Sequence, residues 1–235
     1  MNSTAKSYDV SRGSTKFAAG GATALHSSWA TDEALRLVQL IFLNHAQASP
    51  RVVVVSGVDH GSGCTEICVA VAETLAKNSG KPVCLVEGNF RTPSLSKLYG
   101  GKNDSGWTNL LASEAPIRSF AQQIGGENLW LLPSGPISSD SSDVLLSGGL
   151  RERMQELRET FAFVIVDTPP LTRYSDAIVF GQMSDGMVLI VEADTTRREA
   201  ALAAVQNVRS AEVEVLAAVF NKRTFPIPEN VYRKL

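Results

Sequence analysis

Disulfides, membrane spans and a strong net charge are all missing from this sequence. Its three cysteines, Cys64, Cys68 and Cys84, are too few and too clustered for a disulfide framework, which favours a reducing cytoplasm. No apolar run approaches the roughly 18 residues that span a bilayer. A formal net charge of −2 gives no bulk attraction to nucleic acid, so no nucleic-acid partner is expected.

The N-terminal segment also has almost nothing to bury. Residues 1–27 are small and polar and have no apolar core, so they predict a disordered tail rather than a secretory signal. A helix is expected over residues 28–50, because Leu35, Val38 and Phe42 fall on one helical stripe. Residues 51–235 are then expected to form a single domain.

From residue 51 onward, short apolar runs alternate with helical patterns. Strands that are apolar throughout indicate a parallel sheet covered by helices on both faces, so the fold class expected is α/β with a doubly wound, mainly parallel sheet. Ligands of such sheets bind at the carboxyl ends of the strands, where Glu87, Asp167 and Asn221 stand. The expected strands are Val52–Ser56, Pro82–Val86, Leu129–Leu132, Phe161–Val166, Met187–Val191 and Leu216–Phe220.

The stretch Ser56–Thr65 is typical of a phosphate-binding loop, since it is a glycine-rich turn between an expected strand and an expected helix. Glycines let backbone N–H groups close around a phosphate, and the helix N-terminus adds partial positive charge. The nucleotide-binding form has lysine directly before the Ser/Thr, and here that position holds Cys64. The predicted nucleotide-contacting residues of the loop are His60, Gly61, Ser62, Gly63, Cys64, Thr65 and Glu66.

A second signal is Asp167, which follows four apolar residues as in a Walker B motif. Its carboxylate would hold Mg²⁺ directly or through water, with the Thr65 hydroxyl as the ligand from the loop. The alternative is that Asp167 only caps the Thr-Pro-Pro turn that follows it. The glycine-rich loop upstream favours the magnesium site.

Taken in order, these motifs resemble the bacterial tyrosine kinase (BY-kinase) family, which is related to the MinD and ParA ATPases. Residues 83–95 (VCLVEGNFRTPSL) are similar to its Walker A′ motif, and residues 163–170 (FVIVDTPP) to its Walker B motif. The resemblance implies a P-loop NTPase fold with ATP or ADP and Mg²⁺ as cofactors, and adenine contacts from Asn221 and Arg223. It also implies a cytoplasmic module paired with a membrane chain-length regulator of capsule or exopolysaccharide export.

The departures from the family pattern fall on the phosphate chemistry. Cys64 replaces the loop lysine, and Glu87 and Asn89 stand where the Walker A′ motif has two aspartates. Losing one preorganised charge-stabilising donor lowers a rate by roughly 10²–10³, and displacing a carboxylate by about an ångström lowers it by about 10² more. Glu87, Asn89 and Asp167 are therefore expected to form a degenerate catalytic set. Only Tyr232 stands in place of the family's tyrosine-rich tail, which also argues against tail autophosphorylation.

Three functions remain open at this level. The first is a regulator of polysaccharide polymerisation and export that docks on a separately encoded membrane partner and transfers little or no phosphate. The second is an active kinase or ATPase, in which Arg91 or an arginine from a neighbouring subunit replaces the lysine. Arg91 either approaches the phosphates or only pins its loop. The third is a MinD/ParA-like positioning protein, although that group's second loop lysine and membrane-targeting helix are missing.

Two further patterns each allow two interpretations. Cys64 and Cys68, one helical turn apart, are either a redox or metal pair or simply small residues without a role. Two ligands alone do not make a structural zinc site. Glu33, Arg36 and Gln39 resemble the family's ring-forming Glu-x-x-Arg-x-x-Arg helix, which implies contact with a second copy of the chain. The alternative is an amphipathic helix that packs on its own domain.

Overall fold

An eight-stranded sheet organises the computed structural model, which describes residues 6–9, 28–43, 49–136 and 142–223. The strand order is β1-β8-β7-β2-β6-β3-β5-β4, and neighbouring strands are parallel except for the short pair β4 and β5. The expected doubly wound, mainly parallel α/β fold is thereby confirmed. The strands are β1 (Lys6–Asp9), β2 (Val52–Gly57), β3 (Val83–Glu87), β4 (Gln122–Gln123), β5 (Leu129–Leu132), β6 (Phe163–Thr168), β7 (Gly186–Glu192) and β8 (Val215–Asn221).

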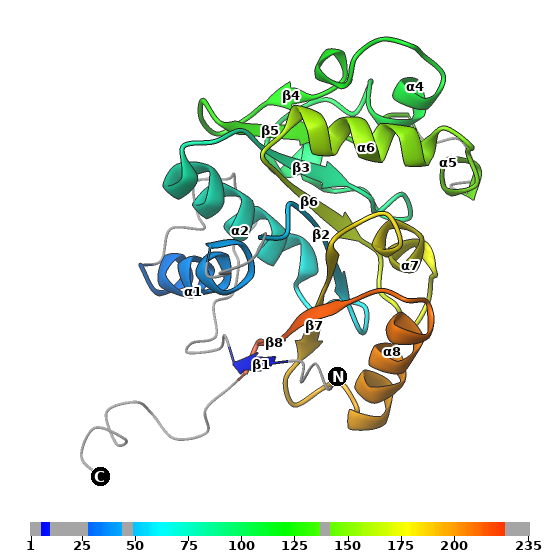
Figure 1. The fold of residues 1–235 in the computed structure, drawn as a ribbon. Helices are drawn as coiled ribbons and strands as arrows, with labels where there is room; N and C mark the ends of the chain where they lie inside the picture. The colour runs from blue at the N-terminus through cyan, green and yellow to red at the C-terminus, as the bar shows by residue number, and fades with distance from the viewer. Residues whose placement is uncertain (1–5, 10–27, 44–48, 137–141, 224–235) are drawn as a thin grey trace.

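Helices cover both faces of this sheet (Figure 1), with α1 and α2 on one side and α6, α7 and α8 on the other. Side chains alternate across a strand, so Val53 and Val55 of β2 join the core under α1 and α2, while Val52 and Val54 join the opposite core. The helical segments are α1 (Ser28–Val38), the π-helical turn η2 (Gln39–Leu43), α2 (Cys64–Ser79), α3 (Leu95–Leu98), α4 (Trp107–Leu111), the 3₁₀ turn η3 (Ile117–Ser119), α5 (Ser142–Leu145), α6 (Leu150–Thr160), α7 (Asp176–Gly181) and α8 (Arg198–Ser210).

The N-terminal helix packs on its own domain. Leu37 and Val38 of α1, followed by Phe42 of η2, are buried in the same core as α2. The Phe42 ring meets Phe163 of β6 edge to face, with 5.6 Å between the ring centroids. Of the apolar stripe expected for this helix, Val38 and Phe42 are therefore buried against the chain's own domain, and Leu35 is half-buried. The role of the helix in subunit contact stays a prediction.

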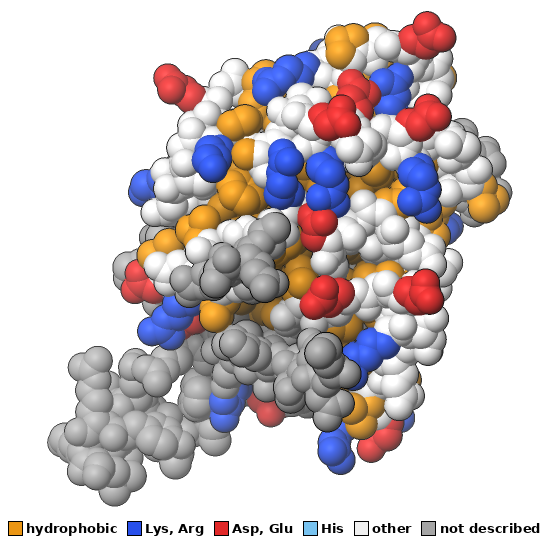
Figure 2. Space-filling view, in the orientation of Figure 1, with side chains coloured by type: hydrophobic (Ala, Val, Ile, Leu, Met, Phe, Trp, Pro, Cys, Tyr) orange, Lys and Arg blue, Asp and Glu red, His pale blue; other side chains and the backbone are white. Residues whose placement is uncertain are grey.

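One expectation about the N-terminus is wrong. Residues 6–9 form β1, which pairs in parallel with β8 at the edge of the sheet, so the predicted disorder does not hold for them. Residues 1–5 and 10–27 lie outside the described residues, and so does Tyr232. None of the described helices is long and apolar enough to cross a bilayer. Figure 2 shows a face on which Lys and Arg side chains are interspersed with Asp and Glu.

Candidate functional site

The loop between β2 and α2 has the backbone of a phosphate cradle. Gly61 and Gly63 adopt φ angles of 84° and 82°, in the left-handed region that glycine reaches without strain. Gly63 directly precedes α2, and a Cβ atom there would lie 2.4 Å from Nδ2 of Asn221. The predicted glycines thus stand where the turn and the close approach of a neighbouring side chain require them.

A cleft of about 170 Å³ opens over this loop. Ligand pockets usually enclose roughly 300–1,000 Å³, so this cleft can enclose a phosphate group but only part of a nucleotide. Among its described lining residues there is no Lys or Arg, whereas two carboxylates, Asp59 and Glu66, are present. The lining residues are Gly57, Asp59, His60, Gly61, Ser62, Gly63, Cys64, Thr65, Glu66, Asn89, Thr92, Ser94, Thr168 and Pro170.

Asp167, fully buried on β6, connects this strand to the first turn of α2. Thr65 Oγ1 donates a hydrogen bond to its Oδ2 at 2.7 Å, and Cys64 Sγ donates to its Oδ1 at 3.2 Å. Cys68, one turn further along α2, has its Sγ 3.7 Å from the same Oδ1. The structure therefore brings together Thr65 and Asp167, the two predicted magnesium ligands, and adds two thiols to them.

Burial controls the protonation of this cluster. It raises the pKa of Asp167 to about 6, although the hydrogen bonds from Thr65, Cys64 and Cys68 act in the opposite direction. The hydrogen bond with Cys68 lowers the pKa of the Cys64 thiol, but burial and the charge of Asp167 outweigh it and raise that pKa to about 11. Burial also raises the pKa of Cys68 well above its usual value. At neutral pH the carboxylate is thus ionised and both thiols are protonated, so neither cysteine is an activated nucleophile.

Glu87 is a buried carboxyl group at the end of β3, in register with Asp167 of β6. Its Oε2 accepts the backbone N–H groups of Ser94 and Leu95 at 2.9 and 2.7 Å. Its Oε1 has no partner among the described residues. Burial, and then repulsion from Asp167, raise the pKa of Glu87 to about 8. Glu87 is therefore mostly protonated at neutral pH. It is also not among the residues that line the cleft.

Asn89 and Arg91 hold their own loop in place. Asn89 lines the cleft, and its Oδ1 accepts the backbone N–H groups of Arg91 and Thr92 at 3.2 and 3.1 Å. The Arg91 guanidinium forms two 3.2 Å hydrogen bonds with the buried Asp176 and lies 4.7 Å from the centre of the Tyr174 ring. These contacts favour the interpretation that Arg91 pins the loop.

The end of β8 reaches the phosphate loop from the other side. Asn221 Nδ2 donates to the carbonyl oxygen of Ser62 at 2.9 Å, and Lys222 Nζ donates to the carbonyl oxygen of Gly61. Lys222 also pairs with Glu192 at 3.6 Å. Arg223 is exposed and does not line the cleft. Sequence reasoning passed over Lys222, and the only available signal was its position between Asn221 and Arg223.

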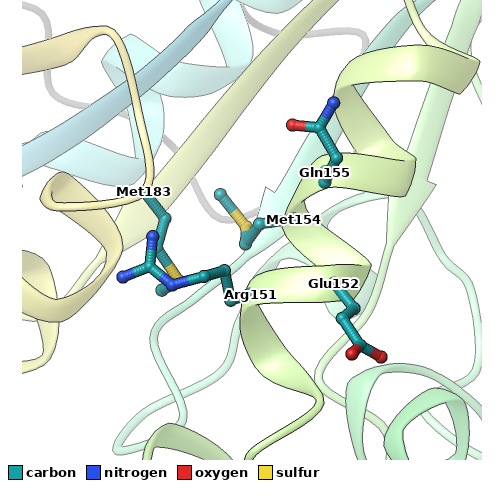
Figure 3. Close-up of a pocket in the computed structure, with 5 residues that line it drawn as sticks. All are labelled: Arg151, Glu152, Met154, Gln155 and Met183. Carbon is teal, nitrogen blue, oxygen red and sulfur yellow. The ribbon is translucent and has the colours of Figure 1, made fainter.

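A second hollow, of about 470 Å³, lies between α6 and the residues that follow α7 (Figure 3). Arg151 and Met183 approach each other across it, and the buried Met154 lies behind them. Glu152 and Gln155 complete the lining. None of these residues belongs to the predicted site, so the cleft over the phosphate loop remains the candidate functional site.

Known proteins match this arrangement in sequence and in fold. The model of the family described as cellulose biosynthesis protein BcsQ matches residues 51–221. Tyrosine-protein kinase YwqD of Bacillus subtilis (strain 168) is 27% identical over 169 residues, 72% of this chain and 71% of that protein.

Among solved structures, the chimerical protein CapA2B2 has a TM-score of 0.78 at 21% identity, over 85% of this chain and 87% of the other. The septum site-determining protein MinD with Mg-ADP from Pyrococcus horikoshii OT3 has a TM-score of 0.62 at 18% identity, over 78% and 76%. These likenesses confirm the resemblance to BY-kinase and MinD-like P-loop proteins that the motifs indicated.

Proposed function

We propose that this chain, which belongs to the cellulose biosynthesis protein BcsQ family, is a pseudokinase that regulates capsule or exopolysaccharide polymerisation and export. It docks on a separately encoded membrane regulator of polysaccharide chain length, and so lies at the inner face of the membrane. Support comes from relatives named as tyrosine-protein kinases and from the BY-kinase pattern of the motifs.

One observation carries the proposed loss of phosphoryl transfer. The described lining of the cleft contains no Lys or Arg. Cys64, which stands where nucleotide-binding loops have lysine, donates a hydrogen bond to Asp167. Phosphoryl transfer depends on preorganised positive groups that stabilise charge on the moving phosphoryl group. Asp59 and Glu66 add negative charge to this cleft. Arg91, the residue considered as a replacement, is held by Asp176.

The residues present fit a phosphate and a magnesium ion better than they fit catalysis. The backbone of Gly61 and Gly63 would surround the phosphate, and Thr65 and Asp167 would hold the metal. When bound, magnesium neutralises charge on the phosphate oxygens. We therefore expect weak binding of ATP or ADP with Mg²⁺, which isothermal titration calorimetry at millimolar nucleotide would detect. A titration without heat would contradict this expectation.

The loss of transfer is tested with labelled ATP and Mg²⁺, comparing the unmodified chain with Cys64→Lys. We expect no turnover above background for the unmodified chain and detectable turnover for the variant, because one charge-stabilising donor is restored. No turnover in either protein would show that Glu87 and Asn89 also block transfer. Cys84→Ser, which changes a buried cysteine outside the cluster, is the matched control and should stay inactive. Turnover by the unmodified chain would overturn the pseudokinase proposal. If that turnover rises steeply with protein concentration, an arginine from a second subunit is the source.

The regulatory role is tested in the organism that produces the chain. Deleting the gene should change the length distribution of the secreted polysaccharide. The unmodified gene and a Thr65→Ala variant, which lacks a predicted magnesium ligand, should both restore it, because the role does not require phosphate transfer. Unchanged polymer after deletion would overturn the role and leave the MinD/ParA-like positioning function as the better explanation.

A further inference from the structure

We propose that Cys64, Cys68 and Asp167 form a binding site for a thiophilic divalent cation of the Zn²⁺ class. The site occupies the place where a P-loop protein would hold magnesium. It does not depend on the proposed regulatory role, since it follows from the side chains that gather around Asp167.

The three ligand atoms already stand at the spacing of a metal site. The two Sγ atoms and a carboxylate oxygen of Asp167 all lie within 4.8 Å of one another. Oδ1 of Asp167 is 3.2 Å from Cys64 Sγ and 3.7 Å from Cys68 Sγ. Zn–S bonds of about 2.3 Å and Zn–O bonds of about 2.0–2.2 Å in a tetrahedron put sulfur and oxygen about 3.5 Å apart. An ion would thus require only small side-chain movements.

Rigid elements carry the ligands. Cys64 and Cys68 are four residues apart on α2, so they share one face of the helix. Asp167 belongs to the buried strand β6, and its second oxygen, Oδ2, is already held by Thr65 Oγ1. Such an outer hydrogen bond orients a carboxylate ligand toward its metal. The cluster therefore has three ligands and one orienting group before any ion binds.

An ion could reach the three ligands from the cleft, because one of the ligands lines it. Cys68 and Asp167 are completely buried, whereas Cys64 is half-buried and lines the cleft. The fourth coordination position is therefore expected to face the cleft, where water or an anion would complete the tetrahedron. Three protein ligands with one open position is the arrangement of zinc sites that are not purely structural.

The ligand set selects the class of metal. Thiolates suit soft and borderline ions such as Zn²⁺, whereas Mg²⁺ requires an octahedron of oxygen atoms. Binding of Zn²⁺ releases the two thiol protons to solvent and leaves two thiolates and one carboxylate around the ion. The replacement of lysine by Cys64 thus does more than remove a positive charge. It supplies a sulfur ligand beside the Asp167 carboxylate, which is also the expected magnesium ligand.

The test uses Co²⁺ as a spectroscopic probe on the purified full chain, without nucleotide. We expect a thiolate-to-cobalt charge-transfer band and the visible bands of a tetrahedral site, which saturate at one ion per chain and disappear on addition of Zn²⁺. Cys64→Ser and Asp167→Asn should each lower the apparent affinity by more than about tenfold, since loss of an outer-shell group alone costs 10–100-fold.

Cys84→Ser is the matched control, because Cys84 packs in the core on the opposite face of the sheet from Cys68. It should keep the bands unchanged. Absence of a saturable band in the unmodified chain would overturn the proposal, as would a Cys64→Ser variant that binds Co²⁺ with unchanged affinity. If circular dichroism shows that Asp167→Asn does not fold, Cys64→Ser, at the half-buried position, still decides the question. The assay involves neither ATP nor polysaccharide, so its failure leaves the pseudokinase proposal intact.

Discussion

At the scale of single residues, the protonation of Glu87 is coupled to folding. Its pKa rises from 4.5 to about 8 when burial and Asp167 surround it, so the folded chain binds more protons than the unfolded chain between these values. Stability should therefore fall as the pH rises through this window, by about 1.4 kcal/mol for each unit of pKa shift. The part of the window from about pH 7 to about pH 8 isolates Glu87 from Asp167, because Asp167, with a pKa of about 6, is almost fully ionised by pH 7.

Glu87→Gln tests this coupling with little change of shape. We expect the free energy of unfolding of the unmodified chain, from urea denaturation, to decrease between pH 7 and pH 8. The variant should show a nearly flat profile over the same range, because its amide does not ionise and its oxygen still accepts the N–H groups of Ser94 and Leu95. An equal slope in both proteins would show that another group carries the dependence.

At the scale of elements, η2 is an integral part of the domain rather than a detachable arm. Phe42 is 2% exposed and contacts Phe163, whereas the next residue, Leu43, is 45% exposed. Phe42→Ala should lower the free energy of unfolding by about 3–5 kcal/mol, because it leaves a cavity between η2 and the sheet. Leu43→Ala is the matched control and should stay within about 0.5 kcal/mol. Equal stability of the two variants would mean that the helix separates from the domain.

The elements predicted correctly from the sequence are those with a local signal. The run Val52–Val55 is apolar throughout and forms β2, and the glycines of the loop carry their positive φ angles where the turn needs them. Strand β1 was missed because its four polar residues acquire their order only by pairing with β8, more than two hundred positions away. The residues of the candidate site also divide into those with a local sequence signal and those placed by tertiary packing. Thr65 and Asp167 were predicted from motifs, whereas the contact of Lys222 with the loop depends on tertiary packing.

At the scale of the whole molecule, Leu37 and Val38 of α1 are buried, so among the described side chains of this helix the polar edge is the surface that we consider for contact with a second copy of the chain. Arg36 is 69% exposed and pairs with Glu33, three residues away, at 3.2 Å. The Glu33 side chain is 14% exposed, but Arg36 lies in solvent, which screens the pair. The pair should therefore contribute at most about 1 kcal/mol to the monomer, and Arg36 can exchange its partner for one in a neighbouring subunit at little cost. Gln39, which stands in place of the family's last arginine, offers no charge to the contact.

We therefore predict weak, concentration-dependent self-association through this edge, weaker than a contact with two bidentate arginines would give. Sedimentation velocity over a wide range of protein concentration should show it for the unmodified chain. Arg36→Glu should abolish the association, because it reverses the charge that a neighbouring subunit would contact. It should change the melting temperature little, because the pair with Glu33 contributes at most about 1 kcal/mol. Arg209→Glu on α8 reverses another exposed positive charge, and this variant should associate normally. If the unmodified chain stays monomeric at every concentration, α1 serves only its own domain, and an arginine from a second copy cannot complete the cleft through this edge.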